Sequence, residues 1–78
     1  MLKPRVYTRS EQVMDMLRSK IYASEHDYRV IARRCGVSES TIYAIRRGAT
    51  RWPRPATFFA LIEFFDLQLV LAEREELN

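Results

Sequence analysis

The sequence is poor in the residues that build disulfides and metal sites. Its 78 residues include one cysteine and one histidine, so an intrachain disulfide is excluded and a zinc site is not expected. We interpret Cys35 as a buried structural thiol and His26 as a solvated loop residue. The sequence therefore predicts neither a metal nor a cofactor.

Long apolar runs are also missing. No stretch approaches the roughly 20 apolar residues that a transmembrane helix needs. The segment MLKPRVYTRS lacks the apolar centre of a signal peptide. We therefore expect a cytoplasmic protein that does not associate with membranes.

The chain offers little for catalysis. With 47% apolar residues it can form one small domain, but a domain of this size has no room for a large internal active site. It holds two glycines in all, too few for a phosphate-cradling loop, and no paired catalytic residues. We do not expect an enzyme.

Charge is abundant and unevenly distributed. Residues 28–55 contain seven arginines and one acid, a local charge of +6, whereas residues 56–78 contain five acids and one arginine, a local charge of −4. This pattern predicts a surface that binds a polyanion and a separate surface turned away from it. A basic face that is merely solvated is the alternative.

Apolar spacing predicts a first helix over residues 9–22, with Thr8 and Glu11 as a capping box. Asp27 is placed to cap a second helix, and Gly36 to end it.

Two more helices follow. Ser38 is placed to cap a third helix, which extends through Arg47 and is closed by Gly48. Pro55 suits the first turn of a fourth helix, which ends near Asp66. The sequence thus predicts an all-α fold.

The second and third helices are separated by residues 36–38 alone. A turn this short makes the helices cross steeply, as in a helix-turn-helix. Ile42 and Ile45 then face inward with Val37. The opposite side of the third helix carries short or flat groups able to meet base edges, flanked by arginines able to hold phosphate. Its residues are Glu39, Ser40, Tyr43, Ala44 and Arg47.

The stretch DYRVIARRCGVSESTIYAIRRG, residues 27–48, resembles the helix-turn-helix of the lambda-repressor-like (Cro/XRE-type) DNA-binding domains. Ala32 falls on the small residue at the helix crossing, and Gly36 and Gly48 fall on the glycines of the turn and of the end of the recognition helix. The apolar residues of the third helix also match. The resemblance covers residues 9–67 and implies a bundle of four to five helices that binds duplex DNA.

The loop GATRWPRP is similar to that of the phage-repressor branch, which implies that Arg54 approaches the minor groove with Arg51 and Trp52 beside it. Trp52 is either a core residue or an anchor facing phosphate.

Two positions depart from the family pattern. Tyr28 stands where the family has a glutamine that braces the recognition helix and a phosphate, and a phenol can still donate one hydrogen bond. Glu39 replaces a glutamine or arginine, and its carboxylate can accept from cytosine N4.

We predict two sets of DNA contacts. For Tyr43, packing on the first helix is the alternative, and Thr41 is assigned through its backbone amide near the helix N-terminus. The base-reading residues are Glu39, Ser40, Tyr43 and Ala44. The backbone-contacting residues are Tyr28, Arg29, Arg33, Thr41, Arg46, Arg47, Arg51 and Arg54.

The segment DLQLVLAE, residues 66–73, alternates in the manner of a strand. An isolated strand needs a partner, and we expect its own copy across a two-fold axis. A fifth helix is the alternative. The predicted dimer interface comprises Phe64, Phe65, Leu67, Leu69 and Leu71.

The expected organisation is a basic N-terminal arm (residues 1–7), a helix-turn-helix domain (8–66) and a dimerisation segment with an acidic tail (67–78). The expected function is sequence-specific regulation of transcription by a homodimer, with repression through an inverted-repeat operator. The alternative is an antitoxin that neutralises a toxin protein and regulates its own operon.

Overall fold

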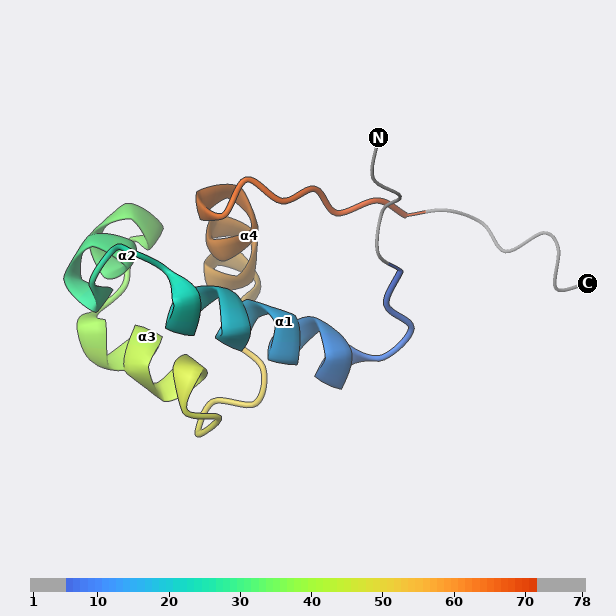
Figure 1. Ribbon diagram of the computed structural model, residues 1–78, viewed down its shortest axis with the longest axis horizontal. Coiled ribbons are helices and arrows are strands. Elements are labelled where there is room, and N and C mark those ends of the chain that lie inside the picture. The colour runs from blue at the N-terminus through green and yellow to red at the C-terminus, as the bar shows by residue number, and fades with distance from the viewer. Residues whose placement is uncertain (1–5, 72–78) are drawn as a thin grey trace, which may run out of the picture.

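The computed structural model describes residues 6–71 and contains four α-helices in that range. They are α1 (Ser10–Ala23), α2 (Tyr28–Cys35), α3 (Glu39–Arg46) and α4 (Pro55–Phe64) (Figure 1). Residues 6–71 contain no strand. The predicted all-α fold is confirmed.

Local side-chain caps start α2 and α3 where the sequence predicts them. The Asp27 carboxylate accepts a hydrogen bond from the backbone N–H of Val30 at 3.3 Å. The Ser38 hydroxyl does the same for the N–H of Thr41 at 3.2 Å. These bonds satisfy amides that lack partners inside the helix, which is why Asp and Ser favour this position.

Glycines end these two helices by turning left-handed. Gly36 has φ 72° and Gly48 has φ 86°, angles at which a side chain would be strained. After Gly36, the N–H of Val37 donates to the carbonyl of Ala32 at 3.0 Å, so the chain wraps back over the last turn of α2.

The start of α1 differs from the prediction. The Gln12 side chain accepts from the backbone N–H groups of Thr8 and Arg9 at 3.0 and 3.2 Å, and Arg9 occupies the capping position. The predicted capping box of Thr8 and Glu11 is therefore wrong. Gln12 is one residue further along, and its side-chain oxygen accepts from both amides.

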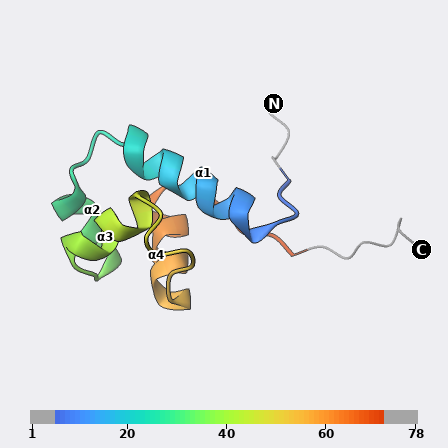
Figure 2. The same ribbon diagram turned by 90° about the horizontal axis from the view of Figure 1, so that it is seen from below.

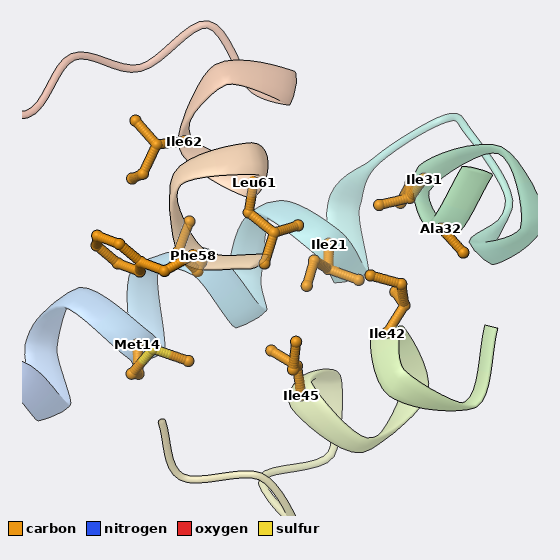
Figure 3. Packing of buried hydrophobic residues seen from close by; sticks show 10 residues of the cluster. Met14, Ile21, Ile31, Ala32, Ile42, Ile45, Phe58, Leu61 and Ile62 are labelled. Carbon is orange, nitrogen blue, oxygen red and sulfur yellow. The ribbon is translucent and has the colours of Figure 1, made fainter. Parts of the chain in front are cut away.

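The four helices enclose one apolar core (Figure 3). α2 packs against α3 and α4, and α1 packs against α3. Both overall views show α2 and α3 at the end of the molecule away from the start of α1 (Figures 1 and 2). The buried apolar residues are Met14, Leu17, Ile21, Ile31, Ala32, Ile42, Ile45, Phe58, Leu61 and Ile62.

Helix α4 ends two residues earlier than predicted. Asp66 takes a left-handed conformation at φ 57°, which aspartate tolerates better than most side chains. The N–H of Leu67 then donates to the carbonyl of Ile62 at 2.8 Å. This is the same closing turn as at Gly36, formed without a glycine.

The segment after α4 is neither helix nor strand over residues 67–71. Leu67 packs against the core, whereas Leu69 and Leu71 are 49% and 92% exposed. Pairing of this segment with a second copy stays a prediction. Residues 1–5 of the predicted arm, the end of the predicted strand at 72–73, and the acidic tail lie outside the described residues.

Candidate nucleic-acid interface

The interface centres on α3, which presents one side to the core and the other to solvent. Ile42 and Ile45 are both 0% exposed. On the opposite side Glu39, Ser40 and Tyr43 are exposed. The turn between α2 and α3 fixes this orientation, because Val37 is partly buried and packs against the core. The predicted facing of the helix is confirmed. Ala44 is half-buried at the edge of the solvent side, and Arg47, the C-cap residue that follows α3, is exposed.

Tyr43 belongs to a stack on the exposed side of α3. Its ring centroid lies 6.2 Å from that of Tyr28 on α2, with the rings inclined by 45°. The guanidinium carbon of Arg47 lies 5.4 Å from the same ring. Tyr43 thus packs against α2, and it stays 49% exposed. The neighbours limit its motion while leaving the ring accessible.

The N-terminus of α3 is already engaged by its own cap. The N–H of Thr41 donates to the hydroxyl of Ser38, and the hydroxyls of Ser38 and Thr41 lie 2.9 Å apart. Ser40 Oγ lies 3.0 Å from the same Ser38 hydroxyl. The phosphate contact predicted through the Thr41 amide is therefore not supported, because this donor serves the cap. A Thr41 contact would have to use its hydroxyl.

The loop between α3 and α4 holds the predicted basic residues at the surface. Arg51 and Arg54 are exposed, and Pro53 between them is buried. Trp52 is 49% exposed and stacks on Phe58 of α4, with ring centroids 5.2 Å apart and an interplanar angle of 25°. One side of the ring packs on an aromatic core residue while half of the residue faces solvent. This packing ties the loop to α4. A contact of Trp52 with phosphate stays a prediction.

The arginines of the helices have different surroundings. Arg29 and Arg33 are exposed on α2. Arg29 lies 3.8 Å from Asp27, but with both side chains exposed this ion pair contributes little. Arg46 is half-buried, with its guanidinium carbon 4.7 Å from the centroid of the Tyr22 ring on α1. Arg46 is thus directed at α1, and a phosphate contact would compete with this packing.

Arg18 of α1 is an additional residue of this region that the sequence did not reveal. Its guanidinium donates to the backbone carbonyls of Ile45 and Thr50 and pairs with Asp15. Periodicity places Arg18 beside the core face of α1 but gives no sign of partners 27 and 32 residues away. An open groove of about 730 Å³ lies here. Its arginines are Arg18, Arg46, Arg47 and Arg51, and its acids are Glu11 and Asp15.

Possible metal ligands and a single thiol are also found among the described residues. Within residues 6–71 there is no group of three or more side chains able to hold a metal ion. Cys35 is half-buried, and burial raises the pKa of its thiol. A raised pKa keeps the thiol protonated at neutral pH, and the protonated form is a poor nucleophile.

Two short helices are joined at a left-handed glycine, the second has a polar outer side, and a basic loop follows it. These features define a helix-turn-helix DNA-binding domain. A family model described as helix-turn-helix matches residues 27–71. The chain belongs to this family, in its lambda-repressor-like (Cro/XRE) type, and is a DNA-binding transcriptional regulator.

The comparison with curated proteins and the comparison with solved structures found no match. None of the helices within residues 6–71 has the length and apolar character needed to cross a bilayer.

Proposed function

We propose that the chain is a sequence-specific, dimeric transcriptional repressor that binds an inverted-repeat operator through the major groove. The observation that carries the proposal is the solvent-facing side of α3, where Glu39, Ser40 and Tyr43 are exposed beside Arg47. A helix with such a side, held rigidly by a core on its other side, is the element that reads base edges in this class of domain.

The reading residues have distinct roles in this proposal. Glu39 lies in the first turn of α3 and accepts from cytosine N4, and Ser40 beside it donates or accepts. Tyr43 and Ala44 offer apolar surface, which suits a thymine methyl group. Such a set favours particular bases. A carboxylate in the groove is repelled by phosphate, so it is favourable only opposite a base that donates a hydrogen bond to it.

Phosphate binding is assigned to groups around this helix. Arg51 and Arg54 in the loop after α3 are exposed, and so are Arg29 and Arg33 on α2. Contacts of this kind supply most of the affinity and fix the register of the helix on the duplex. The remaining assignments, from Tyr28, the Thr41 hydroxyl, Arg46 and Arg47, complete the proposed set.

The dimer is proposed from the apolar segment after α4. Phe64, Phe65 and Leu67 are partly buried against the core of the same chain, whereas Leu69 and Leu71 are 49% and 92% exposed. In Figure 1 this segment runs on the side of α1 opposite α3, so a partner bound there leaves α3 free. A second copy would bury these side chains and set the distance between two recognition helices.

A toxin protein is the alternative occupant of this surface. A purified chain that remains monomeric at micromolar concentration, yet binds a protein encoded beside it, would favour that alternative. The DNA ligand agrees with the cytoplasmic localisation predicted from the sequence.

The decisive experiment is selection of bound duplexes from random DNA, followed by a titration of the selected duplex against salt. We expect an inverted repeat with half-sites about one helical turn, or a multiple of it, apart. If about six phosphates are contacted per subunit, the log–log salt slope should be on the order of −10 for the dimer. A flat salt response, or selection of no common motif, would overturn the proposal.

A further inference from the structure

We propose that Arg18 of α1 is a positioning residue, which holds the end of the recognition helix and the start of the basic loop in the arrangement that binds DNA. The inference rests on the proposed function, because it concerns the same DNA-binding surface. Arg18 itself touches no DNA in this proposal and acts through other residues.

One guanidinium joins three segments of the chain. Arg18 Nε donates to the carbonyl of Ile45 in the last turn of α3 at 2.9 Å. Arg18 Nη2 donates to the carbonyl of Thr50 in the loop at 3.3 Å. Arg18 Nη1 pairs with Asp15 Oδ1 at 3.1 Å, one turn earlier on α1. The three nitrogens of the side chain thus have three different partners.

The chemistry of this contact favours an arginine. The last carbonyls of a helix carry the negative end of the helix dipole, so a cation is stabilised there. The Ile45 carbonyl accepts from the N–H of Gly48 at 3.2 Å, and its second lone pair accepts from Arg18. The planar fork of a guanidinium can serve two carbonyls at once, whereas an ammonium group is a point charge on a flexible stem. The Arg18 side chain is 21% exposed, which protects these hydrogen bonds from competition by water.

The two carbonyls precede the arginines that are assigned to DNA. Arg47 follows Ile45 by two residues, and Arg51 follows Thr50 directly. We call residues 44–50, which connect the last turn of α3 to the loop, the joint. A further hydrogen bond closes it, because the N–H of Thr50 donates to the carbonyl of Ala44 at 3.1 Å. Arg18 therefore fixes the backbone from which these two guanidinium groups extend.

Gly48 lies between the two carbonyls that Arg18 contacts. A Cβ at this position would lie 4.0 Å from Arg18 Nε, an ordinary van der Waals distance, so it is the φ of 86° that favours glycine here. Arg18 thus passes over the turn between α3 and the loop. The joint has two anchors, a local one formed by the glycine turn and a long-range one formed by the guanidinium.

The loop has its own reporter, which allows a test without DNA. Trp52 is the single tryptophan, and it stacks on Phe58 in the segment that Arg18 secures. In Arg18→Met and Arg18→Lys we expect acrylamide, a neutral quencher, to quench the Trp52 fluorescence more strongly, while circular dichroism at 25 °C remains that of the folded protein. Lys20→Met is the matched control, because Lys20 is exposed on the same helix and its replacement removes the same charge. The quenching of Trp52 in this variant should equal that in the wild type. Unchanged quenching in both Arg18 variants would overturn the proposal.

The DNA test compares positioning with general stability through a double-mutant cycle. We compare the loss of DNA affinity that Arg18→Met causes in two backgrounds. If Arg18 acts by placing Arg51, this loss should be at least about threefold smaller in an Arg51→Ala background than in the wild type. In an Arg29→Ala background the effect should be additive, because Arg29 lies on α2 and shares no contact with Arg18.

The salt slope adds a readout that loss of stability alone would not move. Arg18→Lys keeps the charge but loses the planar fork of the guanidinium. We expect the log–log salt slope of this variant to be less steep by about 0.9 per subunit, the value of one phosphate contact. An additive Arg18–Arg51 cycle, or an unchanged slope in Arg18→Lys, would overturn the proposal. A wild-type protein that does not bind duplex DNA would overturn the proposed function, while the fluorescence test of Arg18 would still stand.

Discussion

The phenol rings of Tyr28 and Tyr43 lie 6.2 Å apart, centroid to centroid, and are inclined by 45°. One ring is on α2 and the other on the solvent side of α3, so the pair bridges the two helices of the helix-turn-helix. Where the family's glutamine would brace the recognition helix by hydrogen bonds, this chain uses ring packing. Such aromatic pairs contribute about 0.5–1.5 kcal/mol beyond the area they bury.

The first prediction separates the ring of Tyr28 from its hydroxyl. Tyr28→Phe keeps the packing against Tyr43 but removes the proposed hydrogen bond to phosphate, and it should weaken operator binding by about 0.5–1.5 kcal/mol. Tyr28→Ala also removes the ring that packs against Tyr43, and it should weaken operator binding more than Tyr28→Phe does. Fluorescence anisotropy titrations of both variants measure this. Equal losses in Tyr28→Phe and Tyr28→Ala would show instead that the hydroxyl, as a donor to phosphate, is the part that matters.

The second prediction distinguishes residues that read bases from residues that hold phosphate. Arg51→Ala and Arg54→Ala should weaken binding to all duplexes about equally. Glu39→Ala and Ser40→Ala should each relax the preference at one position of the half-site by roughly 1–3 kcal/mol. Binding-site selection on the four variants measures both effects. An unchanged selected motif with Glu39→Ala would refute the assigned reading face.

The third prediction concerns the dimer. Leu69→Glu places a charge in the proposed apolar contact, where an unpaired charge is costly. It should convert the dimer to a monomer and lower operator affinity, although Leu69 lies outside the DNA-binding surface. Light scattering and a binding titration measure the two effects. Gln68→Glu is the matched control, because it adds the same charge to the neighbouring exposed residue, and this variant should remain dimeric. A dimeric Leu69→Glu with normal affinity would exclude the interface.

The fourth prediction concerns stability at the start of α3. Ser38→Ala removes the acceptor for the Thr41 amide and should lower the free energy of unfolding by about 1 kcal/mol. Urea unfolding followed by circular dichroism measures it. Ser19→Ala is a suitable control, since Ser19 is exposed in the middle of α1 and its replacement should change stability by less than about 0.5 kcal/mol. A loss of the same size in both variants would argue against the capping role.

The sequence by itself determined the elements that depend on near neighbours. Asp27 and Ser38 cap helices through amides three residues away, and Gly36 closes α2 through its own dihedral angles. The inward side of α3 follows from the 100° step of the helix, which separates Ile42 and Ile45 from the residues assigned to DNA. One local prediction, the capping box of α1, was wrong. Glu11 and Gln12 are neighbours in the sequence, and Gln12 rather than Glu11 accepts from the backbone N–H groups.

Tertiary structure decided which side chains meet across the fold. Arg18 contacts a carbonyl 27 residues away, and Arg46 lies against Tyr22 on α1 instead of extending freely. The periodic pattern of each helix is the same whatever its neighbour, so it predicts the buried side but not the partner. Those partners follow from how the helices cross and from the shared core, which no local spacing encodes. For the same reason the alternating segment 67–71 forms no strand in a single chain, since a strand needs a second edge to pair with.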